Sequence, residues 1–297
     1  MLRLLITPQT CRTDEEVEAM RNTFANPSHF EYLIEEDAIV IGPDGIIARL
    51  VTNCLDERLV ANTREHFTKV KGDLTNRGSV LGDGSMMDRE RKDGTLSHTK
   101  AVPLSIIRKM QANRTYSDFL GWMDKSKFGD RFPECRQTAW STKSPEIHGA
   151  AVPFIRAVDT VYAQELPEHH ARQMEFMSRV SPGFKFADTT FSTCTVNRNL
   201  RTTYHTDRDD FSGGMGNLVV LSCKEGAALV MPKFRAAFLP RPTDVLLMNV
   251  HEMHGNLPFT GERLTAVLYA REHIDECDGY QATDGDLPAS MFGESGR

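Results

Sequence analysis

Short apolar runs separated by turn residues dominate the second half of the chain. After Pro182 six such runs follow one another: TTFSTCTV, NLVVLSC, AALVMP, RAAFLP, DVLLMNV and RLTAVLYA. Runs of this length, bounded by glycine, proline or charged residues, are typical of β-strands. Closely spaced strands of this kind predict an antiparallel sandwich or barrel.

The first half of the chain combines fewer strands with helices and one long polar stretch. The runs AIVIG and GIIARLV are joined by Pro43, Asp44 and Gly45, which predicts a small strand pair. Residues 71–100 are rich in glycine, aspartate, arginine and serine, which predicts a long loop, either functional or a plain insertion. Apolar residues at helical spacing predict two supporting helices, within residues 103–124 and 150–179.

These patterns together predict a single α+β domain over residues 1–297. Residues 1–180 are expected to contain the N-terminal strands, the polar loop and the supporting helices. Residues 181–275 are expected to form the β core, a double-stranded β-helix of the jelly-roll or cupin-like type, and residues 276–297 a C-terminal tail.

Composition and charge narrow the classes of function. Hydrophobic residues make up 40% of the chain and charged residues 26%, as is usual for a globular protein. The net charge of -6 argues against a protein that coats nucleic acid through a general positive field, although a local basic groove is compatible with it. The chain shows no apolar run of transmembrane length and no signal-peptide pattern, so no membrane association is expected.

The cysteines give no sign of a disulfide framework. All six are widely scattered and none belongs to a CxxC pair, so neither disulfides nor a thiolate zinc site is predicted. A reducing compartment fits this usage, which places the protein in the cytoplasm, or in the host cytoplasm if it is phage-encoded. No protein partner is evident.

A histidine and an aspartate two positions apart offer metal ligands. In the segment NRNLRTTYHTDRDDF, His205 and Asp207 follow the strand-like run TTFSTCTV. Residues i and i+2 of an extended chain project to the same side, so one imidazole and one carboxylate can converge on an ion. A facial iron site of two histidines and one carboxylate requires such a pair. HxD alone is a weak signal, because a surface histidine near an aspartate is usually just solvated.

The third ligand is expected in the segment HEMHGN, after the strand-like run DVLLMNV. His251 and His254 compete for this role. We favour His254, because it directly precedes Gly255 and Asn256, where the chain must bend toward the next strand. His251 would then lie beside the site, face the substrate or be exposed.

Arg263 begins the last apolar run, RLTAVLYA, nine residues beyond His254. A guanidinium there is expected to point into the barrel or to lie at its mouth, where it needs an anion. Its planar fork suits the distal carboxylate of 2-oxoglutarate. The plain alternative is a salt bridge to Glu262 or Asp244.

These residues carry a resemblance to a known family. The string NRNLRTTYHTDRDDFSGGMGNLVVLS, followed by DVLLMNVHEMHGNLPFTGERLTAVLYARE, resembles the core of TET/JBP-type iron(II)/2-oxoglutarate-dependent dioxygenases, in particular phage and algal members. The resemblance covers about residues 189–273. It implies Fe(II), 2-oxoglutarate and O2 as cofactors and co-substrates, with the iron held by His205, Asp207 and His254, which also carry the catalysis.

The resemblance further implies a cofactor-binding set and a substrate. Arg263 matches the family's 2-oxoglutarate clamp, and Asn197 and Tyr204 flank the site. The implied activity is oxidation of the 5-methyl group of a pyrimidine in DNA, either 5-methylcytosine or thymine. A base inside a duplex must leave the stack to be oxidised. Four aromatic residues either line its pocket or belong to the core: Trp140, Phe191, Tyr204 and Phe211.

Two other functions stay open at this stage. A 2-oxoglutarate-dependent hydroxylase of a small metabolite, amino acid or peptide would use the same iron ligands, with a closed pocket and no basic groove. A non-catalytic cupin-like binding protein would contain these histidines incidentally and would bind no stoichiometric iron.

Overall fold

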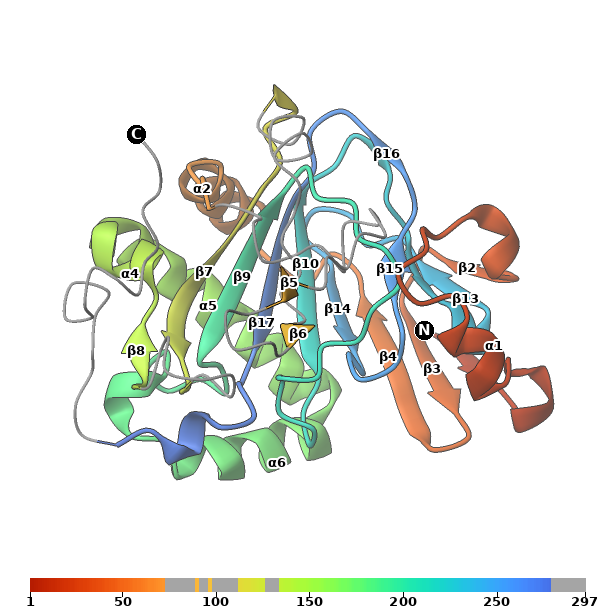
Figure 1. Cartoon of the computed structure of the whole chain (residues 1–297), viewed down its shortest axis with the longest axis horizontal. Helices are drawn as coiled ribbons and strands as arrows, with labels where there is room; N and C mark the ends of the chain where they lie inside the picture. Colours follow the sequence, from red (N-terminus) through yellow and green to blue (C-terminus); the bar gives the residue numbers. More distant parts are fainter. Residues whose placement is uncertain (73–88, 91–95, 98–111, 126–133, 279–297) are drawn as a thin grey trace.

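Two β-sheets of unequal size form the centre of the structure (Figure 1). The computed structural model describes residues 1–72, 89–90, 96–97, 112–125 and 134–278. The large sheet has the strand order β1-β3-β4-β14-β10-β17-β9-β7-β8. Its strands are β1 (Leu2–Leu5), β3 (Ala38–Gly42), β4 (Gly45–Val51), β7 (Tyr116–Met123), β8 (Arg136–Gln137), β9 (Thr193–Arg198), β10 (Gly216–Ser222), β14 (Val245–Met248) and β17 (Leu264–Tyr269).

The small sheet has the order β15-β12-β13-β2. Its strands are β2 (Tyr32–Ile34), β12 (Leu229–Met231), β13 (Ala236–Phe238) and β15 (Gly255–Asn256). Two further pairs are β5 (Arg89–Glu90) with β6 (Leu96–Ser97), and β11 (Glu225–Gly226) with β16 (Phe259–Thr260). All pairings are antiparallel among the described strands except β1 with β3 and β2 with β13.

The strand predictions for the second half are confirmed. Each of the six apolar runs contains one strand, namely β9, β10, β12, β13, β14 and β17. The predicted strand pair in the first half is the hairpin of β3 and β4, whose turn includes Gly45 with a φ of 121°. The mixed α+β class with a double-stranded β-helix core is likewise confirmed.

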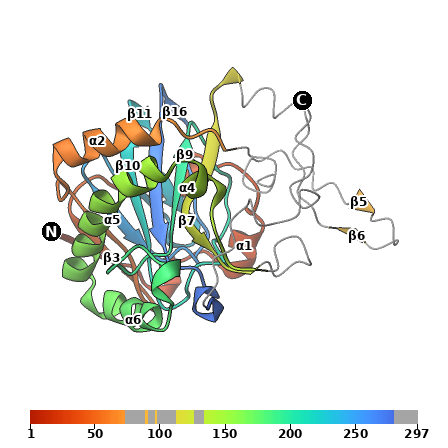
Figure 2. The same cartoon turned by 90° about the vertical axis from the view of Figure 1, so that its left-hand side faces the viewer.

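Helices cover one face of the large sheet (Figure 2). They are α2 (Glu57–Phe67), α4 (Ala139–Lys143), α5 (Pro145–Glu165) and α6 (Pro167–Ser178), whereas α1 (Asp14–Glu18) lies beside the small sheet. Short 3-10 helices are η1 (Pro8–Thr10), η2 (Pro27–His29), η4 (Pro182–Phe184), η5 (Pro232–Phe234) and η6 (Ile274–Glu276). Within the described ranges, no helix combines the length and apolar character needed to cross a membrane.

The helix prediction for residues 150–179 is confirmed, with a break before Pro167, because proline favours the first helical position and disfavours a helical residue before it. The helix prediction within residues 103–124 is wrong for residues 116–123. Residues 116–123 form β7, which pairs with β9. A short apolar run fits the periodicity of a helix as well as that of a strand, and here pairing with β9 makes the segment a strand. Most of the predicted 71–100 loop lies outside the described residues, as does the tail from residue 279.

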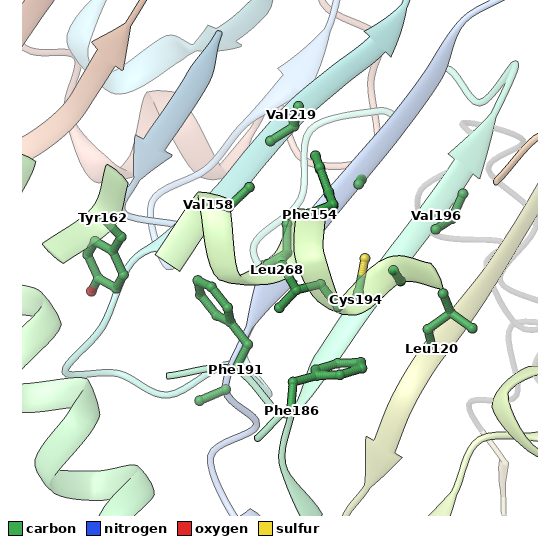
Figure 3. Packing of buried hydrophobic residues seen from close by; sticks show 14 of the residues in the cluster. Leu120, Phe154, Val158, Tyr162, Phe186, Phe191, Cys194, Val196, Val219 and Leu268 are labelled. Carbon is green, nitrogen blue, oxygen red and sulfur yellow. The ribbon is translucent and has the colours of Figure 1, made fainter. Parts of the chain in front are cut away.

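Alternation along the strands divides the large sheet between two cores. Leu247 and Leu268 belong to the core on the helical face, together with Phe154 of α5. Figure 3 shows Leu268 and Phe154 in this core. Leu246 and Met248 belong to the core shared with the small sheet. Successive strand residues face opposite sides, so the helices cover one face and leave the other toward the small sheet.

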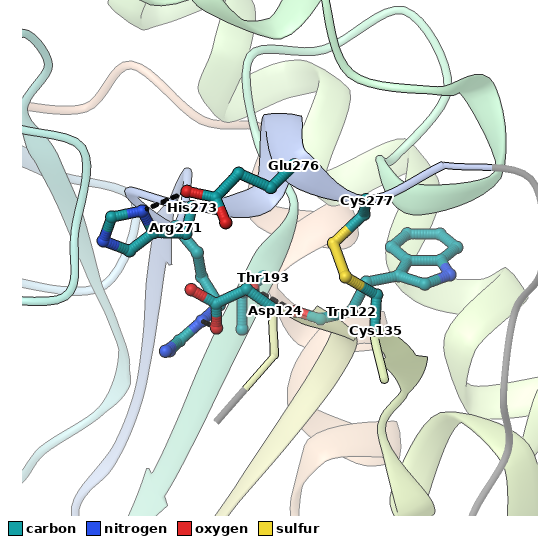
Figure 4. The surroundings of a disulfide bond; sticks show 8 residues. All are labelled: Trp122, Asp124, Cys135, Thr193, Arg271, His273, Glu276 and Cys277. Carbon is teal, nitrogen blue, oxygen red and sulfur yellow. Dashed lines mark hydrogen bonds and ion pairs between the residues drawn. A yellow bond between two sulfur atoms is a disulfide. The ribbon is translucent and has the colours of Figure 1, made fainter. Parts of the chain in front are cut away.

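A disulfide joins Cys135 and Cys277, which are 142 residues apart in the sequence (Figure 4). The expectation that the cysteines form no disulfide is therefore wrong for this pair. Cys135 directly precedes β8 and Cys277 directly follows η6, and only the folded chain brings these segments together. Cys11, Cys54, Cys194 and Cys223 are not disulfide-bonded.

Candidate active site

A cavity of about 720 Å³ lies against the face of the large sheet that is turned away from the helices. Side chains from β9, β10, β14 and β17 line it, together with residues of β12 and β15. On β17 and its flanks every second residue reaches the cavity: Arg263, Thr265, Val267, Tyr269 and Arg271. This spacing follows from strand geometry, because the intervening residues Leu264, Ala266 and Leu268 pack under the helices.

Two histidines and one carboxylate meet at this cavity. His205, Asp207 and His254 each offer one ligand atom, and these atoms lie within 4.8 Å of one another. Nε2 of His205 is 3.7 Å from Oδ1 of Asp207, and Nε2 of His254 is 3.6 Å from Oδ2 of the same carboxylate. Two imidazole nitrogens and one carboxylate oxygen form the donor set of the facial triad that binds Fe(II).

Backbone carbonyls hold both imidazoles in the orientation that a metal requires. Nδ1 of His205 lies 2.7 Å from the carbonyl oxygen of Thr203, and Nδ1 of His254 lies 3.0 Å from that of Glu252. A carbonyl oxygen only accepts, so Nδ1 of each ring carries a proton, which leaves Nε2 on the side of Asp207 as the atom that can bind a metal. The two histidines also pair through their backbones as an antiparallel bridge, which fixes their separation.

The electrostatic balance of the cluster shows in the pKa of His254. Burial lowers this pKa, but the hydrogen bond and the negative charge of Asp207 outweigh it, so the pKa lies above its ordinary value. Without a cation between them, the imidazole and the carboxylate attract a proton. The site therefore has the charge to accept a cation.

Arg263 is a buried guanidinium without a carboxylate partner in the described part of the chain. Its Nη1 donates to the carbonyl oxygen of Leu200 at 3.2 Å, and its Nε has no hydrogen-bond partner there. Burial lowers its pKa to about 10. The salt bridge considered from the sequence does not form, because Glu262 pairs with Arg198 and Asp244 accepts from backbone N–H groups. A buried cation in this state is suited to bind an anion.

The other two residues expected to bind cofactor lie differently. Asn197 lines the cavity, and its Oδ1 accepts a hydrogen bond of 2.6 Å from Ser117. Tyr204 does not line the cavity: it is fully buried in the core beside α1, with its hydroxyl 3.0 Å from Nδ1 of His29. Tyr204 and His205 are adjacent in an extended segment, so their side chains point to opposite sides.

The remaining expectations concern His251 and the aromatic residues. His251 is not part of the metal-ligand cluster and does not line the cavity. Trp140, Phe191 and Phe211 do not line it either: they belong to the core on the helical face or pack against it. Of the two alternatives considered for these aromatic side chains, the core is the one observed.

Sequence reasoning missed part of the cavity wall. Arg271 lies eight residues after Arg263 on the same strand face, and the period of two along β17 could have found it. Its partner Asp124 follows β7 and is buried. Glu18, Arg21 and Asn22 also reach the cavity, from α1 and the turn after it, and no sequence signal indicated them.

This combination of fold and site is that of an oxygenase dependent on iron(II) and 2-oxoglutarate: two sheets enclose a cavity whose wall carries a two-histidine, one-carboxylate cluster and a buried arginine. A model of the Tet_JBP family, the oxygenase domain of the 2OGFeDO superfamily, matches residues 119–272, more than half of the chain. The chain belongs to this family. Enzymes of the superfamily generally use Fe(II), 2-oxoglutarate and O2.

Curated relatives carry the same similarity over part of their length. The bifunctional helicase and thymine dioxygenase JBP2 of Leishmania major is 34% identical over 144 residues, which are 46% of this chain and 13% of the relative. Thymine dioxygenase JBP1 of Trypanosoma brucei brucei is 32% identical over 151 residues, 48% of this chain and 18% of the relative. The similarity thus spans less than a fifth of either relative.

A solved structure shows the same fold. NgTET1, determined in complex with 5mC DNA, superposes with a TM-score of 0.56 over 89% of each chain at 14% sequence identity. At this identity the likeness establishes the fold alone and leaves the choice of substrate open.

Proposed function

We propose that this chain is an iron(II)- and 2-oxoglutarate-dependent dioxygenase that oxidises the 5-methyl group of a pyrimidine, thymine or 5-methylcytosine, in DNA. The observation that carries the proposal is the presence of two complementary sites in one cavity. One is the cluster of His205, Asp207 and His254, and the other is the buried guanidinium of Arg263.

The residues present fit the implied metal and co-substrate. His205 and His254 would bind iron through Nε2 and Asp207 through one carboxylate oxygen, while the carbonyls of Thr203 and Glu252 keep both rings oriented. The Arg263 guanidinium would bind the distal carboxylate of 2-oxoglutarate. When bound, iron with 2-oxoglutarate and O2 supplies the oxidant for an otherwise unreactive C–H bond.

The rest of the cavity would position the substrate and exclude water. Leu218, Met248 and Val267 give it an apolar wall between the two arginine-bearing ends of β17. Its volume of about 720 Å³ lies within the range of small-molecule sites. Such a space suits the co-substrate together with one base turned out of a duplex.

The support for a DNA pyrimidine comes from the family. The names of the two curated relatives compared above include thymine dioxygenase, and NgTET1 was determined with 5mC DNA. Both names concern a pyrimidine that carries a methyl group at C5. We infer the same class of substrate for this chain.

The test is reconstitution with Fe(II) under anaerobic conditions, addition of 2-oxoglutarate and DNA, and exposure to oxygen. Succinate and digested nucleosides are then measured by mass spectrometry. A hydroxymethyl, formyl or carboxyl pyrimidine establishes both chemistry and substrate. Succinate without a modified base supports the dioxygenase chemistry but contradicts the DNA substrate, and metabolites or peptides would then be tested as substrates. The absence of both succinate and bound iron rejects the proposal.

A further inference from the structure

Two arginines lie at opposite ends of the cavity, on the same face of one strand. Arg263 precedes β17 and Arg271 follows it, and both line the cavity. Eight residues of extended chain separate them, which corresponds to roughly 25 Å. The site therefore has two cationic ends with different surroundings, and only one of them is explained by the co-substrate.

The metal-ligand cluster lies between these two ends. The segment from Asn199 to Asp210 runs past all three sites. At its beginning, Asn199 and Leu200 bind Arg263 through three hydrogen bonds of 2.8–3.2 Å. Its middle carries the two candidate metal ligands His205 and Asp207. At its end the backbone of Asp210 pairs with that of Arg271 as an antiparallel β-bridge. If 2-oxoglutarate occupies the Arg263 side, the substrate must approach from the Arg271 side.

Two carboxylates hold the Arg271 side chain, and some of its N–H groups remain for a ligand. Its Nε donates to Oδ1 of the buried Asp124 at 2.5 Å, and its Nη2 lies 3.9 Å from Oδ2 of Asp209 (Figure 4 shows the pair with Asp124). A guanidinium has five N–H donors and no acceptor. In the described part of the chain its side chain makes a hydrogen bond only to Asp124, so the terminal N–H groups can reach into the cavity that it lines.

We propose that Arg271, anchored by Asp124, is the specificity-determining residue that donates to the oxygen at C4 of the base and thereby selects thymine over 5-methylcytosine. This inference rests on the proposed function. The C4 substituent is the neighbour of the methyl group that must face the metal. In thymine it is an acceptor oxygen, whereas in 5-methylcytosine it is an amino donor. An amino group facing a guanidinium leaves donors on both sides unpaired.

The first experiment compares two duplexes that differ at one position, which carries thymine or 5-methylcytosine. All other thymines are replaced by uracil, which lacks the methyl group. We expect kcat/KM for the thymine duplex to exceed that for the 5-methylcytosine duplex by about 100-fold, because the wrong base leaves a buried donor without an acceptor. A ratio near one, or a preference for 5-methylcytosine, overturns the inference. Oxidation of either base keeps the proposed function, whereas succinate without any oxidised base rejects its DNA substrate.

The second experiment assigns the preference to Arg271. In Arg271→Gln the side chain offers both a donor and an acceptor, so we expect the preference to fall below about tenfold. The matched control is Arg198→Gln, which removes an ion pair with Glu262, a residue in the turn before β17 that does not line the cavity. It should keep the full preference. If Arg271→Gln folds but oxidises neither base, anaerobic binding of the two duplexes is compared instead, and a retained preference for thymine overturns the assignment.

Discussion

Replacing Arg263 by methionine should change function and stability in opposite directions. The variant removes the charge from a buried position in the cavity wall and keeps most of the side-chain volume. We expect a large rise in the 2-oxoglutarate concentration needed for turnover. We also expect the metal-free, ligand-free protein to become more stable to heat.

The functional magnitude follows from the contacts of the guanidinium. A bidentate, charge-assisted pair with a carboxylate contributes about 2 kcal/mol or more, which corresponds to an increase in KM for 2-oxoglutarate of roughly 30-fold or more. In the described structure only the carbonyl of Leu200 accepts a hydrogen bond from the Arg263 side chain, so methionine leaves one backbone acceptor without this donor.

The stability magnitude follows from the pKa. Burial lowers the pKa of Arg263 from 12.5 to about 10, so the folded protein holds this proton less tightly than the unfolded chain does. The charged guanidinium therefore disfavours folding at every pH below about 10, by an amount on the order of 3 kcal/mol. Methionine avoids this cost, as expected where a functional residue is kept at the expense of stability.

The assay measures succinate against 2-oxoglutarate concentration at saturating iron, together with thermal melting of the apoprotein. Arg198→Met serves as control, because this arginine pairs with Glu262, which precedes β17, and does not line the cavity. It should leave KM for 2-oxoglutarate unchanged and should not raise the melting temperature. An unchanged KM in Arg263→Met would refute the role in co-substrate binding, and a lower melting temperature would refute the view of an uncompensated buried charge.

Three further predictions concern the metal cluster, the disulfide and the core. His205→Ala and Asp207→Ala should each abolish succinate formation with melting temperatures close to the parent, since neither side chain is a core residue; turnover in both would exclude the metal assignment. Reduction of Cys135–Cys277 by a dithiol should destabilise the fold by up to about 5 kcal/mol in chemical denaturation, whereas Cys135→Ser should show no response to the reductant. Phe154→Ala, at a fully buried position, should lower the free energy of unfolding by about 3–5 kcal/mol, and a loss below 1 kcal/mol would contradict its place in the core.

Local patterns in the sequence were sufficient for the β core. Short apolar runs and turn residues predicted β9, β10, β12, β13, β14 and β17, because these strands are short and bounded by residues that cannot continue them. The same local reading failed for residues 116–123, whose apolar side chains fit a helix as well as a strand. Pairing with β9, a segment distant in sequence, supplies the hydrogen bonds that make these residues a strand.

The sequence by itself determined which residue types were present for the chemistry, and their order: the HxD pair, a later histidine and an arginine at the start of a strand. Tertiary structure decided which of them meet. It brought His254 to the cluster, turned Tyr204 away from the cavity and paired Arg271 with Asp124. These outcomes depend on strand register and on contacts between distant segments, such as Tyr204 with His29, 175 residues apart, which no local pattern encodes.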